Sequence, residues 1–200
     1  MQADLESERL LLRRFVPADA ENLFRLDSDP EVMRFLTGGV PTPRHVIDRD
    51  VLPGMLSEHD HYPELGYWAA IERASGAFVG WFSLRPSKRA RDEVELGFRL
   101  VRDAWGKGLA TEGSVALLTR AFGELEVRRV VATTYENNLA SRRVLEKLGM
   151  RVMRRFHWTA DDLAAAGTFD AASAELWEGC DVEYALDKAA WMGRKAAGAG

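Results

Sequence analysis

The chain has little of what secreted and membrane proteins need. Its 200 residues include a single cysteine, Cys180, which excludes an internal disulfide and suits a reducing compartment. No stretch approaches the run of about 18 apolar residues that a membrane-spanning helix requires. The opening MQADLESERLLLRRF is charged and lacks the apolar core of a signal peptide. These absences predict a cytoplasmic protein that does not enter the membrane.

Other functional classes are disfavoured in the same way. The formal net charge of −4 argues against a nucleic-acid partner, and the one basic run, residues 88–91, is expected to be a solvated loop. His59 and His61 lack partners at metal-ligand spacing, which favours a loop over a zinc site, so no metal is predicted. The sequence contains no G-x-S-x-G pattern, so a serine hydrolase is not supported.

The length fits one domain with its own core. We expect residues 1–192 to form that domain, with an Ala-rich, acidic excursion at about residues 159–179. Residues 193–200 are small and polar and are expected to form a disordered tail.

The hydrophobic periodicity predicts an α+β fold, a three-layer α/β/α arrangement around a mixed, mostly antiparallel sheet. About six to seven strands are expected, at residues 9–15, 67–72, 77–84, 93–100, 127–134, 151–158 and 181–187. Asp29-Pro30 and Thr42-Pro43 are helix-start signals, and Pro53-Gly54 should break or kink the segment around it. Longer helices are expected after residue 108 and after Asn138, the latter ending at Gly149.

The stretch AWGKGLATEG, residues 104–113, places two glycines between a strand end and a helix start. The first amides of a helix lack intrahelical partners, and the helix dipole favours an anion beside them. Without a Cβ, Gly106 and Gly108 would allow a pyrophosphate to approach those amides closely, with Lys107 as an added charge. A tight turn with no ligand is the alternative.

Two common phosphate-binding motifs are excluded at this stretch. A P-loop needs Gly at position 101 and Ser or Thr at position 108, where the chain has Val101 and Gly108. A dinucleotide fingerprint needs Gly or Ala at position 111, where the chain has Thr111, and an acid about 20 residues on, which is absent. ATP and NAD are therefore not the expected ligands.

A second helix start follows the next strand, in NNLASRRVLEKLG. Asn138 and Ser141 are three residues apart and lie on one face of its first turn. Capping of the helix by Asn138 would explain the residue without a ligand. Two such helix starts after neighbouring strands nevertheless point to one shared binding site.

Together, ELGFRLVRDAWGKGLATEG and NNLASRRVLEKLGM resemble the GNAT acyl-CoA N-acyltransferases. The resemblance is closest to the branch of the bacterial ribosomal-protein N-terminal acetyltransferases, the RimJ/RimL-like group. It covers residues 8–151 well and DVEYALDKAAW moderately. It implies a sheet splayed between the fourth and fifth strands, acetyl-CoA as the co-substrate, and a pantetheine arm paired with backbone of the fourth strand.

The resemblance also implies which residues bind the coenzyme. Trp105 stands where the family loop usually has Gln or Arg, a departure typical of this branch. The implied coenzyme-binding residues are Phe98, Leu100, Trp105, Gly106, Lys107, Gly108, Leu109, Ala110, Thr111, Asn138, Ser141 and Arg142.

Acetyl transfer to an amine needs a neutral amine, a donor for the tetrahedral oxyanion and a proton for the leaving thiolate. Glu95 is the predicted base, acting through a water, with Glu93 as the second candidate. A salt bridge from Glu95 to an arginine such as Arg99 is the alternative. The family often uses a tyrosine after the second motif as the acid, but RVMRRFHWTADD contains none.

Ser141 is therefore the predicted acid, with Tyr135 and Tyr184 as alternatives. We expect an N-acetyltransferase that moves the acetyl group directly to a primary amine, on a protein N-terminus or a small molecule. Acidic residues at 56–64 and 160–179 favour a cationic acceptor. The alternative is an acyl-CoA-binding module without turnover that serves as a sensor or partner subunit. A homodimer is compatible with the expected edge strands.

Overall fold

The computed structural model describes residues 5–87, 89–157 and 179–197. The strands are β1 (Leu5–Glu6), β2 (Leu10–Arg14), β3 (Gly66–Glu72), β4 (Phe78–Pro86), β5 (Glu93–Leu100), β6 (Arg129–Tyr135), β7 (Arg151–Phe156) and β8 (Asp181–Asp187). The α-helices are α1 (Ala20–Asp27), α2 (Pro30–Thr37), α3 (Arg44–Val46), α4 (Leu52–His61), α5 (Leu109–Gly123), α6 (Leu139–Lys147) and α9 (Lys188–Ala197). Short 3-10 turns cover residues 17–19 and 102–104, and a π-helical turn covers Ile47–Val51.

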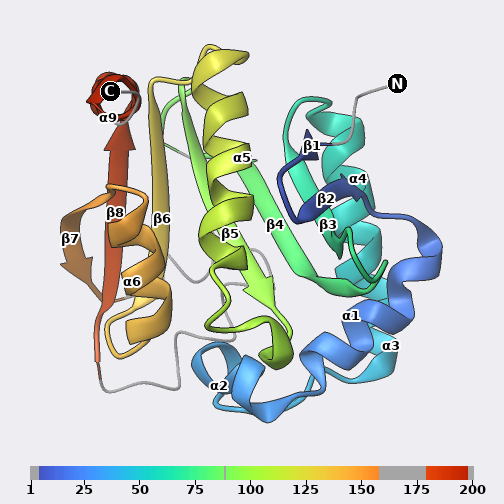
Figure 1. Cartoon of the computed structure of the whole chain (residues 1–200). Coiled ribbons are helices and arrows are strands. Elements are labelled where there is room, and N and C mark those ends of the chain that lie inside the picture. Colours follow the sequence, from blue (N-terminus) through green and yellow to red (C-terminus); the bar gives the residue numbers. More distant parts are fainter. Residues whose placement is uncertain (1–4, 88, 158–178, 198–200) are drawn as a thin grey trace.

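The strands form one mixed sheet in the order β1-β2-β3-β4-β5-β6-β8-β7. Every neighbouring pair is antiparallel except β5 and β6, which run parallel (Figure 1). The α+β prediction and the mostly antiparallel sheet are thus confirmed. The described residues also contain an eighth strand, β1, which was not predicted. A strand of two residues is too short to show a pattern in the sequence.

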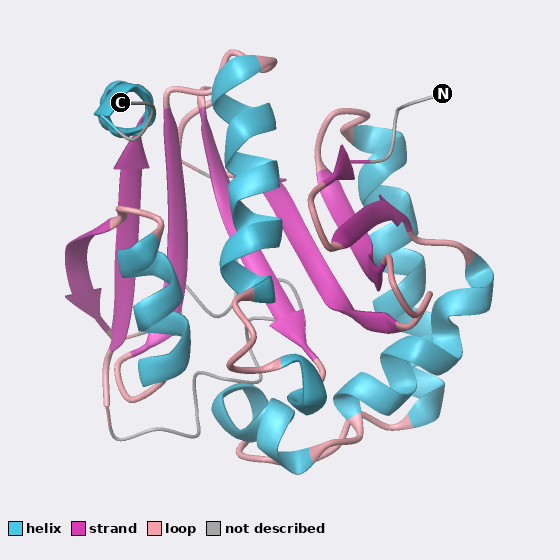
Figure 2. Ribbon diagram, viewed as in Figure 1, coloured by secondary structure: helices cyan, strands magenta, loops and turns pink. Residues whose placement is uncertain are grey.

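Helices cover both faces of the sheet (Figure 2). Side chains alternate along each strand, so β3 and β4 each contribute to two separate cores. One core joins Phe82, Leu96 and Leu100 to Leu117 of α5 and Trp191 of α9. The other joins the opposite face to α1, α2 and α4. The structure therefore has the predicted three layers.

The structure confirms two of the helix-start and helix-end signals that the sequence contains. The Asp29 side chain accepts a hydrogen bond from the Glu31 amide at 3.0 Å, ahead of Pro30 in the first turn of α2. Gly149 follows α6 with a φ of 86°, in the left-handed region that glycine favours. Pro53-Gly54 does not break the helix: the π-helical turn ends at Val51, Pro53 lies in the first turn of α4, and α4 continues to His61.

Two expectations differ from the structure. His59 and His61 lie in the last turn of α4 instead of a loop, because Pro53 starts this helix and its hydrogen bonds continue beyond it. Helix α9 continues through Ala197, so residues 193–197 of the expected tail are helical. Residues 198–200, and all of the expected excursion except Gly179, lie outside the described residues.

Candidate active site

The centre of the sheet opens at the end where β5 and β6 finish. The two strands are paired at only three positions, Glu93 with Arg129, Val94 with Val130 and Glu95 with Val131. From Leu96 onward β5 has no further pairing with β6 in the described structure. Because parallel strands end at the same edge of a sheet, the segments that lead into α5 and α6 both start beside this opening (Figure 1).

The glycine loop at the start of α5 has the backbone shape that an anion site needs. Gly106 and Gly108 have φ values of 72° and 81°, a region that residues with a Cβ rarely adopt. Gly108 is the N-cap of α5 and supplies no side-chain cap, so the first-turn amides lack a side-chain partner. A Cβ built at Gly106 would meet nothing within 4 Å, so the space beside it is open. These features favour an anion over a bare turn.

Trp105 connects this loop to the splayed strand. Its indole Nε1 donates to the carbonyl of Leu100, the last residue of β5, at 2.8 Å. The ring is 46% exposed, so this bond and not burial holds it in place. The residue that departs from the family pattern thus has a structural task in this chain.

The remaining predicted coenzyme residues of β5 and α5 differ in exposure. Leu100 and Leu109 are buried in the core beneath α5, so only their backbone could face a ligand. Phe98 is partly buried and packs against Phe82, with ring centroids 6.3 Å apart. Lys107 is exposed, whereas Ala110 and Thr111 are half-buried in the first turn of α5.

Glu95 lies on the opposite face of β5 from Leu96 and Phe98, as predicted. Its carboxylate is 32% exposed and accepts a hydrogen bond from Arg85 at 3.0 Å, directly across the β4–β5 ladder. The expected arginine partner, Arg99, instead pairs with the buried Asp27 at 2.6 Å. Glu93 is buried and accepts a hydrogen bond from Ser87 Oγ.

Asn138 and Ser141 lie together at the start of α6. The Asn138 side-chain oxygen accepts a hydrogen bond from the Ser141 amide at 3.2 Å, which makes Asn138 the N-cap of α6. Ser141 Oγ has no hydrogen-bond partner among the described residues, so its hydroxyl is available to a ligand. The capping interpretation is confirmed for Asn138, and the coenzyme role of both residues stays a prediction.

Arg142 of α6 pairs with Tyr184 of β8. Arg142 donates to the Tyr184 hydroxyl at 2.9 Å and to the Glu136 carbonyl at 3.0 Å. The hydrogen bond to Tyr184 is the main reason that the pKa of Arg142 is raised. The Tyr184 hydroxyl donates to Glu146 at 3.1 Å, so this tyrosine joins β8 to α6.

Tyr135 ends β6 on the same face as Glu95. Its ring lies 6.0 Å from the ring of Phe35 in α2, and its hydroxyl accepts a hydrogen bond from Asn137. Tyr135 thus lies at the open end of the splay, whereas Tyr184 is held under a helix. Of the two alternative acids, the geometry favours Tyr135.

Within the described ranges, no three His, Cys, Asp or Glu side chains gather to hold a metal ion. None of the helices that the structure describes has the length and apolar character needed to cross a membrane.

Sequence reasoning missed Arg9 as a functional residue. Its side chain reaches the Lys107 carbonyl of the glycine loop and the Glu112 carboxylate in the first turn of α5. The segment that begins ERLLLRRF falls within the residues covered by the family resemblance, but its local pattern gives no sign of a contact 98 positions away.

A mixed sheet that opens between two parallel strands, beside two helix N-termini, is the fold of the GNAT superfamily. A family model described as "Acetyltransferase (GNAT) domain" matches residues 9–151, and the chain belongs to this family. The chain is therefore an acyl-CoA-dependent acetyltransferase by family, and acetyl-CoA is the donor that these enzymes use.

A curated relative covers nearly the whole chain. FsC-acetyl coenzyme A-N(2)-transacetylase of Aspergillus fumigatus is 30% identical over 199 residues, which is 96% of this chain and 79% of the relative.

Solved structures show the same fold at lower identity. A GNAT-family acetyltransferase from Bacillus anthracis superposes with a TM-score of 0.73 at 23% identity, over 94% of this chain and 99% of that one. RimL, a ribosomal L7/L12 alpha-N-protein acetyltransferase solved with coenzyme A, has a TM-score of 0.73 at 16% identity over the same shares of the two chains. At these identities both likenesses show the fold alone.

Proposed function

We propose that this chain transfers an acetyl group from acetyl-CoA directly to a primary amine, on a small molecule or a protein N-terminus. The observation that carries the proposal is the glycine loop, with Gly106 and Gly108 at positive φ and an α5 N-terminus that has no side-chain cap. In this proposal the pyrophosphate binds the amides of residues 106–111. The pantetheine arm follows the backbone of β5 from Leu96 to Leu100, where β6 has moved away.

The chemistry requires three proton transfers and one oxyanion donor. The amine nitrogen attacks the thioester carbonyl, a C–N bond forms, the nitrogen loses its second proton to water, and the C–S bond then breaks to release the coenzyme thiolate. Glu95 takes the ammonium proton through a water before the attack, and a backbone N–H of β5 donates to the oxyanion. Ser141 supplies the proton to the thiolate, with Tyr135 as the alternative.

The hydrogen bond from Arg85 suits this role for Glu95. It holds the carboxylate in one orientation on the open face of β5, while the exposed part of the side chain still admits a water. A base must be within hydrogen-bond reach of its proton or of a bridging water.

The acceptor is proposed from the relative that covers nearly the whole chain. Its name specifies transfer to an N(2) atom, which supports a small-molecule amine as the first acceptor to test. The likeness to RimL concerns the fold, so a peptide with a free N-terminus forms the second arm of the same assay.

The test is release of coenzyme thiol by the purified full chain with acetyl-CoA and a panel of amines. We expect Glu95→Gln to lower kcat about a hundredfold at neutral pH, with the KM for acetyl-CoA little changed. Asp187→Asn is the matched control, because Asp187 also pairs with an arginine across two strands, Arg129, but lies away from the opening.

A binding module without turnover gives a different result. Coenzyme A would then bind, no amine would release thiol, and Glu95→Gln would change nothing. That outcome would overturn the proposed reaction while leaving the coenzyme site in place.

A further inference from the structure

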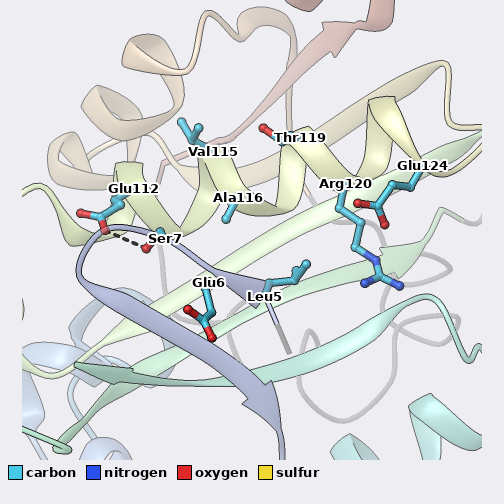
Figure 3. A pocket seen from close by; sticks show the side chains of 9 residues that line it. All are labelled: Leu5, Glu6, Ser7, Glu112, Val115, Ala116, Thr119, Arg120 and Glu124. Atoms are coloured by element: carbon cyan, nitrogen blue, oxygen red, sulfur yellow. Dashed lines mark hydrogen bonds between the residues drawn. The ribbon is translucent and has the colours of Figure 1, made fainter. Parts of the chain in front are cut away.

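Arg9, at the entry to β2, makes a dense set of contacts with α5 and its loop. Its backbone amide donates to Glu112 Oε1 at 2.7 Å, and its guanidinium Nε and Nη2 lie 2.7 and 2.6 Å from Glu112 Oε2. Its third guanidinium nitrogen, Nη1, donates to the Lys107 carbonyl at 3.0 Å. Ser7 Oγ completes the cluster by donating to Glu112 Oε1 at 2.7 Å (Figure 3).

The bond to Lys107 fixes the orientation of one peptide group in the loop. The Lys107–Gly108 peptide is trans, because no cis bond occurs in the described chain. In a trans peptide the C=O and N–H groups point in opposite directions. Since the carbonyl points at Arg9, the Gly108 N–H points away from Arg9. Glycine at position 108 allows the φ of 81° that this orientation needs.

The pairing with Arg9 also neutralises the negative charge of Glu112 beside the proposed anion site. Burial alone would raise the pKa of Glu112, but hydrogen bonds from Ser7 and from the amide and side chain of Arg9 outweigh it and lower that pKa. Glu112 is therefore ionised at neutral pH, within the first turn of α5. An unpaired carboxylate there would repel an anion bound at the same helix N-terminus, and the Arg9 guanidinium offsets it.

We propose that Arg9 is a positioning residue for the coenzyme loop: it aims the Gly108 amide at the pyrophosphate and neutralises Glu112 beside it. This inference rests on the proposed function, because it assumes that coenzyme A binds at this loop. Arg9 acts through Lys107, Gly108 and Glu112, and contact between its own side chain and the coenzyme is not required.

A hollow in the surface lies beside the Arg9 cluster and is separate from the glycine loop. A hollow of about 480 Å³ lies between β1 and α5, and Ser7 and Glu112 are at one end of its wall (Figure 3). The side chains of Arg9 and Lys107 are not part of its lining. The Ser7–Glu112 contact therefore separates this hollow from the glycine loop.

The experiment measures binding of coenzyme A to the full chain by calorimetry, together with acetyl-transfer kinetics. We expect Arg9→Ala to weaken coenzyme A binding about tenfold and to raise the KM for acetyl-CoA by a similar factor. The kcat at saturating acetyl-CoA should stay within about twofold, because Arg9 is placed on the loop and not at the reacting atoms.

Arg73→Ala is the matched control. Arg73 has a similar exposure, 49% against 46% for Arg9, and is tied to the same segment through the Ser7 carbonyl and Glu6. In the part of the chain that the structure describes, Arg73 has no hydrogen bond or ion pair with the glycine loop, so this variant should bind coenzyme A as the wild type does. Equal weakening in Arg73→Ala and Arg9→Ala would mean that Arg9 only holds β1 and β2 in place, and would overturn the proposal.

Two further variants test the role of Arg9 even if Arg9→Ala does not fold. Arg9→Lys should give an intermediate affinity, because lysine restores the charge but lacks the planar fork that reaches both partners. Glu112→Gln should bind coenzyme A at least as tightly as the wild type, because it removes the carboxylate and leaves Arg9 beside the loop. Weaker binding by Glu112→Gln would overturn the proposal.

The two levels of inference fail in different ways. A wild-type chain that does not bind coenzyme A would overturn the proposed function and this inference with it. A wild-type chain that binds, with unchanged affinity in Arg9→Ala, would overturn the inference alone.

Discussion

Asn138 combines an observed structural role with a proposed chemical one. Its side-chain oxygen caps α6 through the Ser141 amide, so that oxygen is already occupied. The Asn138 side-chain NH₂ remains available for a coenzyme contact. Asparagine and aspartate cap helices about equally well, but only asparagine offers an NH₂ donor. Substitution at this position can therefore separate the two roles.

We expect Asn138→Ala to lower the free energy of unfolding by about 1 kcal/mol, through loss of the cap. Asn138→Asp should keep that stability while weakening coenzyme A binding about tenfold, because it removes a donor and places a negative charge near the anion site. Chemical denaturation and calorimetry measure the two effects. Wild-type coenzyme affinity in Asn138→Asp would show that Asn138 is only a cap.

For single residues, the sequence predicts the structural features that depend on residues nearby in the chain. The cap at Asn138, the helix end at Gly149 and the positive φ of the loop glycines all follow from local rules. Contacts between distant segments do not. Arg9 meets Lys107 across 98 positions, and Glu95 meets Arg85 of the neighbouring strand instead of Arg99 of its own.

Helix α5 lies unusually close to β4 because of one glycine. A Cβ built at Gly113 would fall 2.3 Å from Cζ of Phe82, a fully buried ring. Atoms cannot approach so closely, so any side chain at this position would push α5 off the sheet. Gly113 therefore fixes the height of the helix whose N-terminus forms the glycine loop.

Gly113→Ala should destabilise the chain by about 1–3 kcal/mol, the usual cost of overpacking a core. Gly123→Ala, in the last turn of the same helix, is the matched control, because its Cβ would meet nothing within 4 Å. That change should be neutral or stabilise the chain by up to about 1 kcal/mol, through helix propensity. Thermal and denaturant unfolding of both variants give the comparison. Equal effects would contradict the proposed close contact with Phe82.

Whole elements were predictable wherever their pattern was long. The strand at residues 93–100 matches β5 in full, and the helix after Asn138 ends where Gly149 indicates. The two-residue β1 escaped prediction because no periodicity can develop over that length. The end of α4 was missed because the lack of metal-ligand partners for His59 and His61 favoured a loop, whereas the helix that Pro53 starts continues to His61.

Periodicity predicted the layers and a mixed sheet, whereas the splay within that sheet was predicted through family resemblance. Patterns along the chain indicate which residues form strands, but not that β5 and β6 are parallel or that their pairing stops at Glu95. The resemblance supplied the splay between the fourth and fifth predicted strands. The site depends on this large-scale feature, since it places both helix starts at one opening.

The stability of the whole molecule should fall in acid, because several carboxylates are better stabilised as anions in the folded state. Asp19 is the best defined of them. Burial raises its pKa, but bonds from Arg13 at 2.7 and 2.8 Å, from the Val16 amide and from Asn22 outweigh burial and lower it below the ordinary value. Glu183, which pairs with Arg89 and Arg154, is similar. Burial raises its pKa, but the two arginines outweigh burial and lower the pKa below its ordinary value.

A folded-state pKa below the unfolded one gives stability that is present above the unfolded pKa, about 3.9 for Asp. This stability is lost as the pH falls through the folded pKa. We expect Asp19→Asn to be less stable than the wild type at pH 7, by about 3 kcal/mol for a broken buried pair. The difference should shrink steadily below about pH 4, because the wild-type carboxyl also becomes neutral there. Denaturant unfolding between pH 7 and pH 3 measures it.

Leu23→Ala serves as the control for this pH series. Leu23 is fully buried in α1, next to the segment that Asp19 holds, and its loss should cost about 2–5 kcal/mol without changing any titratable group. The gap between Leu23→Ala and the wild type should therefore stay constant from pH 7 to pH 3. If the Asp19→Asn gap stays equally constant, the carboxylate of Asp19 has no part in the acid sensitivity of the fold, and the pairing with Arg13 stabilises the chain only by packing.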